Sequence, residues 1–410
     1  MKKVILCLLV SASTSVIYGQ TKATDVVYRR SSLFTLMVTD QERDYADAIE
    51  GAFKSAEIPE KFNNHNIDLR TIAKVVDESN SLSKKELKEA QKLANKAFFS
   101  TNKIAKAIVA KWFNRSEQGG FNMDLISKRG LYNATELDMK IAKNSERGLA
   151  LLADAGEELI NNTFIVVNDF SYINKEEVAG KVKKGFGFAG SLMGSSALTS
   201  SLVNKTLDVA GKGYVIKTTS NLYKLVWDEE TAAIFYNDYW NDDANINLAK
   251  KKAFEASDIF KVELIGTEVA WADLQSTSFT KKTEEELVAV ATVKAVDAVI
   301  AKLQRKYEVF RTKTPLISGD PISAKIGLKE GLEKGDKYEV LEQNIDKNGK
   351  TFYKRKGVIK VNKKQIWDNR FLAGEEKEAT ESKEEEEVKE YTLFKGGKKY
   401  YSGMLIRQIN

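Results

Sequence analysis

Two residue types that carry much of enzyme and metal chemistry occur once each in this chain, as His65 and Cys7. A Cys-His pair or a zinc site needs several such groups, and a Ser-His-Asp triad would have to use His65. His65 lies in the asparagine-rich stretch 63–66, which we predict to be a surface loop. We therefore reject these three chemistries and name no catalytic, cofactor-binding or metal-binding residue.

Paired carboxylates could still supply acid and base groups, and Glu157-Glu158 and Asp242-Asp243 are examples. Such pairs are ordinary on a solvated helix face or turn, whereas glycosidase chemistry needs two carboxylates across a cleft. The glycines between residues 185 and 190 satisfy the spacing of the dinucleotide-binding motif. A charged stretch precedes them where that motif requires a strand, so we interpret the spacing as a coincidence.

The first nineteen residues predict export. Lys2 and Lys3 precede the apolar run 4–10, and small residues at 15–19 end in a cleavage site before Gln20. Cys7 lies inside the apolar run and would be removed with it, so we predict neither a lipid anchor nor a disulfide. The apolar run is too short for a transmembrane helix. We expect an exported protein of the periplasm or one associated with the outer membrane.

The net charge of +6 conceals an asymmetry, because residues 375–390 carry nine glutamates against three lysines. Loss of Lys2 and Lys3 with the leader would leave +4, and setting aside the local −6 leaves about +10 on the rest. The lysines are spread along the chain without an aromatic cluster among them. This spread favours a solvated surface and argues against nucleic acid as a partner.

The elements that must position any site are built around residues 137–172. An amphipathic helix there carries Ile141, Leu149, Leu152 and Leu159 on one face and leads into the apolar strand Phe164 to Val167. A strand without polar alternation is expected in the centre of a sheet that helices cover on both faces. We therefore predict an α/β (α+β) fold with a three-layer mixed sheet flanked by helices.

Hydrophobic periodicity and capping signals give the other elements. Ser83 with Glu86, and Thr283 with Glu286, form capping boxes at two helix starts. Five aromatic residues of a predicted hairpin at 214–240 could form a stacking platform, but we prefer packing across the strands; they are Tyr223, Trp227, Tyr236, Tyr239 and Trp240. The predicted strands are 26–38, 67–76, 121–126, 214–227, 231–240 and 260–271, and the predicted helices are 41–56, 84–97, 102–113, 244–257 and 284–310.

A second, smaller unit follows at the carboxyl end. Thr314-Pro315 stops the longest helix, and the residues from Ser318 to Pro321 are the best candidate for a linker. Short strands with glycine turns then predict a small all-β, barrel-like domain. The expected domains are a signal peptide at 1–19, an α/β domain at 20–315 and a β-domain at 316–410 with an acidic loop at 375–390.

The order of a helix with Trp112-Phe113, the strand 121–126, Arg129-Gly130, a long helix and the strand Phe164 to Val167 resembles the curli-secretion channel family. The TolB amino-terminal domain and the middle domain of flagellar assembly protein T share this plan, and the pattern after residue 316 is similar to the carboxy-terminal β-domain of the latter. The resemblance over residues 26–310 implies an envelope protein that assembles or scaffolds, without catalytic residues.

The leading hypothesis is therefore an exported cell-envelope scaffold or binding protein that is not an enzyme. Its expected partners are an envelope protein or a second copy, with possible contact to a membrane surface. A first alternative is a membrane-associated secretion or assembly component, because apolar residues alternate with small ones over 185–203 as in a barrel strand. That stretch equally fits a helix or a surface loop, which we prefer. A second alternative is a carboxylate-based hydrolase.

Overall fold

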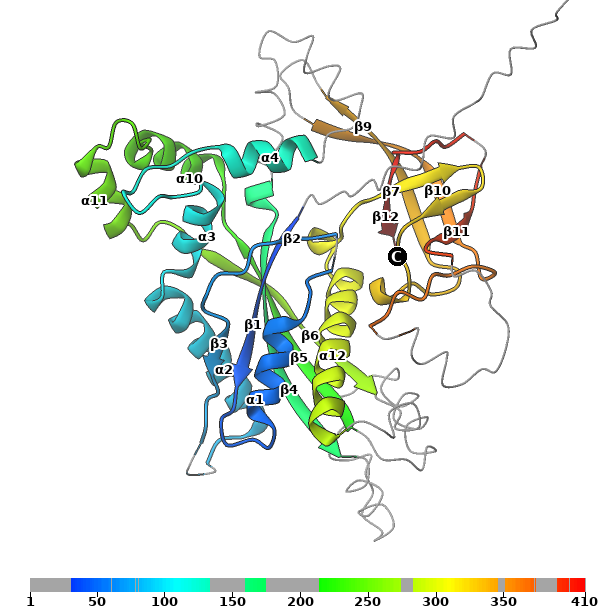
Figure 1. Cartoon of the computed structure of the whole chain (residues 1–410), viewed down its shortest axis with the longest axis horizontal. Coiled ribbons are helices and arrows are strands. Elements are labelled where there is room, and N and C mark those ends of the chain that lie inside the picture. The colour runs from blue at the N-terminus through cyan, green and yellow to red at the C-terminus, as the bar shows by residue number, and fades with distance from the viewer. Residues whose placement is uncertain are drawn as a thin grey trace, which may run out of the picture.

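The computed structural model of the 410-residue chain describes residues 31–59, 61–77, 79, 81–132, 159–174, 214–273, 283–345, 351–371, 373, 389–397 and 399–409. These residues form a mixed sheet between helical layers and a separate ring of six strands (Figure 1). The predicted α/β class is confirmed. The leader 1–19, most of the helix predicted from 137, the stretch 185–203 and residues 375–388 of the acidic run lie outside the described residues.

The mixed sheet is organised around β1 and β4, which lie next to each other and run parallel. Its order is β2-β1-β4-β5-β6, and β3 also pairs with β1. β1 is parallel to β2, β3 and β4, whereas β4, β5 and β6 pair antiparallel. The strands are β1 (Ser32–Thr39), β2 (Asn63–Asn64), β3 (Thr71–Ala73), β4 (Thr163–Asn174), β5 (Tyr214–Leu225) and β6 (Val262–Asp273). The carboxyl ends of β1, β3 and β4 therefore meet at one edge of the sheet.

β4 is a central strand, as predicted, and the side chains from Phe164 to Val167 are fully buried. Phe164 and Val166 face one hydrophobic core, while Ile165 and Val167 face the other. Apolar side chains cover both faces, so this strand needs no polar alternation.

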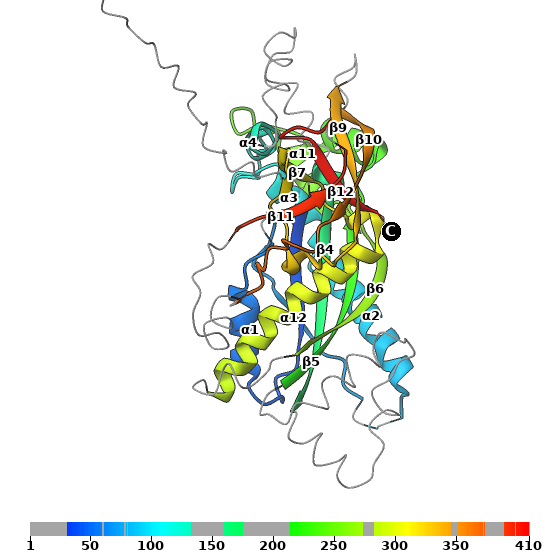
Figure 2. The same ribbon diagram turned by 90° about the vertical axis from the view of Figure 1, so that its right-hand side faces the viewer.

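Helices cover both faces of the sheet (Figures 1 and 2). α1 (Ala46–Ser55) and α12 (Glu284–Lys306) pack on one face, and a larger group of helices, beginning with α2 and α3, packs on the other. This second layer contains α2 (Lys84–Thr101), α3 (Ile104–Trp112), α4 (Asp124–Tyr132), α10 (Glu229–Ile234), the π-helical turn η1 (Phe235–Tyr239) and α11 (Leu248–Ala256). The sheet is therefore the middle of three layers.

Both predicted capping boxes are confirmed. Ser83 Oγ accepts from the Glu86 N–H at 3.3 Å, and the Glu86 carboxylate accepts from the Ser83 N–H at 2.7 Å. Thr283 and Glu286 form the same pair of bonds at 3.2 and 2.7 Å. α12 ends at Lys306, before the predicted end, and a 3₁₀ turn η3 (Glu308–Phe310) follows.

Two predicted strands, 121–126 and 231–240, are wrong, and so is the predicted hairpin at 214–240. Residues 121–126 contain no strand, because α4 begins at Asp124 and Asn122 Oδ1 accepts from its N–H at 3.1 Å. Residues 231–240 are α10 and η1, because Asp228 caps that helix by accepting from the Thr231 N–H at 2.8 Å. Short aromatic-rich runs do not separate strand from helix by periodicity, so the caps decide.

The second sheet is a closed barrel with the strand order β10-β11-β8-β7-β12-β9. Its interior is filled by side chains such as Leu316, Val340, Ile359, Phe394 and Ile406. The strands are β7 (Thr314–Gly319), β8 (Ile322–Ala324), β9 (Lys337–Ile345), β10 (Thr351–Val361), β11 (Thr392–Lys395) and β12 (Leu405–Ile409), with a 3₁₀ turn η4 (Leu328–Glu330) between β8 and β9.

The prediction that the residues from Ser318 to Pro321 form a linker is wrong. These residues form the end of β7 and the turn into β8, inside the barrel. Pro315, which was expected to stop the long helix, lies in β7 opposite Leu405. The connection between α12 and the barrel is instead the stretch 307–313.

Ionic and hydrogen-bonded contacts join the barrel to the end of α12. The guanidinium of Arg305 lies 3.0 Å from the carboxylate of Asp336, and Lys329 Nζ lies 3.6 Å from Asp297 Oδ2. Arg311 donates to the carbonyl oxygen of Gln408 at 3.3 Å. The helix that covers the sheet therefore also holds the barrel.

Candidate functional site

A polar hollow of about 540 Å³ lies at the carboxyl ends of β1, β3 and β4. In open α/β sheets, ligands bind outside the carboxyl ends of the strands, so this is the edge at which a site is expected. The lining residues are Asp40, Glu42, Arg43, Asp44, Lys74, Phe170, Ser171 and Tyr172. We name this feature the carboxyl-edge hollow.

Asp40 is the most firmly positioned charge in the hollow. It follows the last residue of β1, and Lys74 follows the last residue of β3, so the parallel pairing of the two strands brings the side chains together. Lys74 Nζ donates to Asp40 Oδ2 at 2.8 Å, and the Arg43 guanidinium lies 3.8 Å from the same oxygen. The hydrogen bond from Lys74 lowers the pKa of Asp40. This carboxylate is therefore ionised at neutral pH.

Asp169 adds a second carboxyl of different character. It lies on β4, and the charges of Lys74, Arg43, Asp40 and Lys217 act on its carboxyl group. Burial raises the pKa of Asp169, and within the described residues its Oδ1 atom is inaccessible and has no hydrogen-bond partner. A buried carboxyl oxygen without a partner is costly, so Asp169 contributes an unsatisfied polar atom beside the hollow.

Tyr172 connects the hollow to the helical layer. The guanidinium of Arg43 lies 5.3 Å from the centre of its ring, and its hydroxyl is 2.8 Å from Thr292 Oγ1 on α12. Thr292 itself donates to the carbonyl oxygen of Val288, so the Tyr172 hydroxyl is the donor to Thr292. Burial raises the pKa of Tyr172. The phenol of Tyr172 is therefore uncharged, and its position at the side of the hollow is fixed.

The charges of the hollow suit recognition of a cationic group. Three lining carboxylates, Asp40, Glu42 and Asp44, face two lining cations, Arg43 and Lys74. The two positive and three negative side chains give the lining a net charge of 2 − 3 = −1, without Asp169. An amine or guanidinium entering the hollow would meet this excess of carboxylate, while the ion pairs already present hold the geometry.

The sequence alone did not identify this site. Asp40 and Lys74 each come directly after a strand, which is the local signal that could have raised them as candidates. Their pairing depends on which strands are neighbours, and the sequence does not state this.

The prediction that His65 is a surface residue is wrong, because its side chain is fully buried. The ring stacks on Trp112 with centroids 4.7 Å apart, and Nε2 donates to the Ile108 carbonyl at 3.1 Å. The guanidinium of Arg129 lies over the same indole at 4.7 Å and 3.5 Å from His65 Nδ1. Burial, followed by the nearby Arg129 charge, lowers the pKa of His65 to about 3. His65 is a neutral core residue.

The five aromatic residues considered as a platform belong to a packed core, in agreement with the preferred interpretation. Tyr223, Trp227 and Tyr239 are buried, and Tyr236 and Trp240 pack against the same cluster. Three of the five lie on or directly after η1 rather than on a strand, which corrects the predicted geometry.

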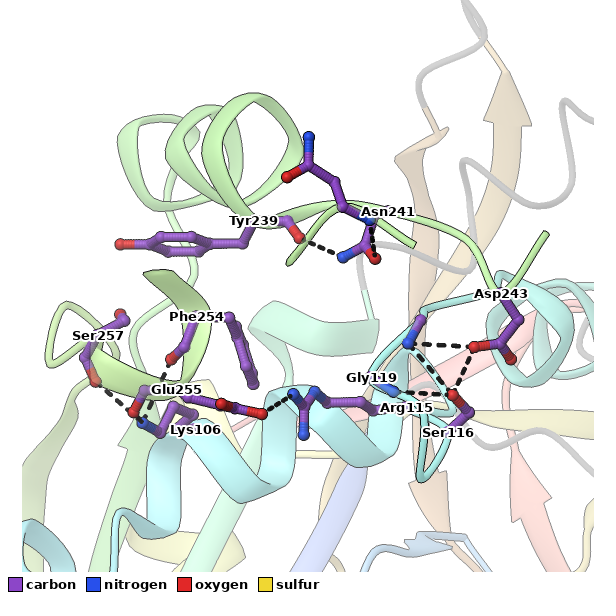
Figure 3. A network of polar contacts seen from close by, with 12 residues as sticks. Lys106, Arg115, Ser116, Gly119, Tyr239, Asn241, Asp243, Phe254, Glu255 and Ser257 are labelled. Atoms are coloured by element: carbon purple, nitrogen blue, oxygen red, sulfur yellow. Dashed lines mark hydrogen bonds and ion pairs between the residues drawn. The ribbon is translucent and has the colours of Figure 1, made fainter. Parts of the chain in front are cut away.

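Asp242 and Asp243 form hydrogen bonds that stabilise turns, and they are not a carboxylate pair across a cleft. Asp243 Oδ1 accepts from the Ser116 hydroxyl at 2.5 Å and from the Gly120 N–H at 3.1 Å (Figure 3). Asp242 accepts from the Asn245 N–H at 2.9 Å. These bonds agree with the structural interpretation given to the pair. Glu157-Glu158 and the glycines at 185–190 lie outside the described residues.

A second polar network holds α11 against α3. Lys106 Nζ donates to the carbonyl oxygens of Phe254, Glu255 and Ser257, which end the helix, and Arg115 pairs with Glu255 at 3.0 Å (Figure 3). A cation on the last carbonyls of a helix also complements the helix dipole. The network therefore caps the carboxyl-terminal end of α11.

Over the described ranges, no group of three or more His, Cys, Asp or Glu side chains is arranged to hold a metal ion. In the same part of the chain, none of the helices has the length and apolar character that crossing a membrane requires. Comparison with protein-family models and with curated proteins finds no match for this chain.

Proposed function

We propose that this chain is an exported scaffold or binding protein of the cell envelope and that it has no catalytic activity. The leader-like residues 1–19 support export. The observation that carries the proposal is the carboxyl-edge hollow, in which Asp40, Lys74 and Arg43 hold one another in ion pairs. Because the pKa of Asp40 is lowered, this group serves recognition by charge rather than proton transfer near neutral pH.

The barrel supports the scaffold part of the proposal. Contacts from Arg305, Asp297 and Arg311 tie it to α12, so the two units present their surfaces in a fixed relation. A protein that assembles partners needs such a fixed spacing between binding faces.

One observation favours a membrane-associated component as a second candidate. β4 ends at Asn174 and β5 begins at Tyr214, and these two residues pair directly with each other. Paired strand ends are what a hairpin extension requires, and 185–203 carries the alternation of apolar and small residues described above. This candidate differs from the first in requiring lipid contact.

Asp169 favours the third candidate, a carboxylate-based hydrolase. A buried carboxyl with a raised pKa beside an ionised one is the pattern by which acid and base roles are divided in hydrolases. Turnover of a glycan or peptide that is abolished by Asp169→Asn or Asp40→Asn would overturn the scaffold proposal.

The direct test places a photo-crosslinking residue at Ser171, which is exposed and lines the hollow. In cells that export the full chain, we expect one discrete adduct in the envelope fraction. The charge reversal Glu42→Lys changes the net charge of the lining from −1 to +1 and should remove the adduct, whereas Glu117→Lys, on an exposed turn, should leave it intact. Equal melting temperatures for the two variants would show that Glu42→Lys does not act by unfolding the chain.

Two results would contradict this proposal. The first is an adduct that is insensitive to Glu42→Lys, because the hollow would then not recognise its partner by charge. The second is retention of the full chain inside the cell, with deletion of residues 1–19 making no difference to its location.

A further inference from the structure

Three lysines lie side by side on the outer face of the barrel. Lys360 of β10 is directly opposite Lys337 of β9 on one side and Lys395 of β11 on the other. All three side chains are exposed, while their sequence neighbours Tyr338, Ile359 and Phe394 point into the barrel core. We name this set the lysine row.

The charge of the lysine row is not compensated by its neighbours. The nearest carboxylates along β9 belong to Asp336 and Glu339, and both are held by arginines. Asp336 lies 3.0 Å from Arg305, and Glu339 lies 2.6 Å from Arg407. Within the described part of the chain, the three lysines form no ion pair.

This arrangement works against the stability of the barrel. Side chains directly opposite in a sheet have their Cβ atoms about 5 Å apart, and like charges in that position are destabilising. Lys360 meets such a neighbour on both sides. Like charges placed opposite each other lower stability, and no contact in the described residues offsets this loss. Such an arrangement is expected at a functional surface, where binding can offset it.

We propose that the lysine row is a docking surface for an acidic polypeptide segment of a partner. The row runs across three strands that lie about 4.8 Å apart, so a chain laid across them can bring successive carboxylates to the three flexible ammonium groups. The barrel already shows one contact of this kind, because Glu390, in the acidic run, pairs with Lys325 at 4.0 Å. The acidic run of a second copy, with nine glutamates in sixteen residues, has the required chemistry.

A lipid surface fits the lysine row less well. Stable binding to a membrane takes an apolar anchor or a lipid chain beside a basic patch. The apolar residues next to the row are Val358, which is 37% exposed, and Ile409, which is partly buried. Neither offers an anchor, so acidic polypeptide is the assigned partner class.

The test titrates the full exported chain with a fluorescent peptide that has the sequence of residues 375–390. We expect saturable binding that weakens as salt is raised, and at least a fivefold higher Kd for Lys360→Glu. Lys360→Arg should retain binding, and Lys252→Glu on α11 should bind like the parent chain. A peptide with every glutamate replaced by glutamine should not bind.

Stability gives an independent readout for the same variants. Lys360→Glu replaces two repulsive cross-strand pairs by two attractive ones, so its melting temperature should be equal to or above that of the parent chain. If that variant melts lower, Lys395→Glu replaces it in the binding assay. Loss of binding in a chain that is not destabilised supports the docking surface.

Three outcomes would overturn the proposal. They are no binding of the peptide, equal losses for Lys360→Glu and Lys252→Glu, and binding to vesicles with 30% phosphatidylglycerol that depends on Lys360 while the peptide does not bind. The test is independent of the carboxyl-edge hollow, because failure here leaves the crosslink at Ser171 unaffected.

Discussion

The free energy of unfolding of the chain should fall as pH rises through the range in which Asp297 ionises. Asp297 lies on α12 and is only 8% exposed, and burial raises its pKa to about 6. Lys329 lowers this pKa and Glu330 raises it, both from η4, and the Lys61 ammonium contributes a smaller lowering. Within the described residues Asp297 Oδ2 has no hydrogen-bond partner, although Lys329 Nζ lies 3.6 Å away.

The sign follows from comparing the folded and unfolded chains. The folded pKa of about 6 is above the ordinary value of 3.8, so the folded chain binds the proton more tightly. This favourable contribution is fully present below pH 3.8 and is lost as pH rises through 6. The difference between a pKa of about 6 and one of 3.8 corresponds to about 3 kcal/mol, most of which should be lost between about pH 4 and pH 7.

The measurement compares urea unfolding of the parent chain and Asp297→Asn at pH values from 4 to 8. Other titrating groups contribute equally to both chains, so the difference between the two free energies of unfolding isolates Asp297. We expect the parent chain to lose about 3 kcal/mol relative to Asp297→Asn as pH rises. The exposed Asp258→Asn should show no such trend. Parallel pH curves for parent and Asp297→Asn would refute the reasoning.

Four further predictions concern the core and the caps. The ring of His65 should stay neutral from pH 5 to 8 by NMR, and because its pKa is lowered to about 3, its contribution to stability should be lost as pH falls below 6.5. Phe235→Ala should destabilise the chain by about 3–5 kcal/mol in urea unfolding, because the ring is fully buried. Gly266→Ala would place a Cβ 2.1 Å from the Tyr307 hydroxyl and should cost about 1–3 kcal/mol, part of which Tyr307→Ala should restore in a double-mutant cycle. Thr283→Ala should cost about 1 kcal/mol by loss of the capping box, and a melting temperature equal to that of the parent would contradict this.

The elements with strong local signals could be predicted from the sequence. Ser83 with Glu86 and Thr283 with Glu286 fix two helix starts, because a cap is formed by residues three apart and needs no tertiary partner. The run Phe164 to Val167 identified the central strand, since only a strand covered on both faces is uniformly apolar. These features determined the fold class.

Weak local signals misled where tertiary packing decides. The aromatic run 231–240 is rich in residues that favour strands, yet Asp228 caps a helix there and the rings pack into the core. His65 lies among asparagines in the sequence, but its ring is covered by Trp112, which is 47 positions away. Burial of a polar residue depends on distant partners that composition does not reveal.

The acidic run and the apolar faces of the helices can be predicted from the sequence itself, because charge and periodicity are properties of consecutive residues, and the leader at 1–19 stays a prediction of the same kind. The two proposed binding faces were decided only by the tertiary structure. Asp40 meets Lys74 because β1 and β3 are parallel neighbours, and the lysine row exists because one register places residues 337, 360 and 395 in line. A shift of one residue in that register would turn Lys360 into the barrel, so the surface depends on strand pairing between segments far apart in the chain.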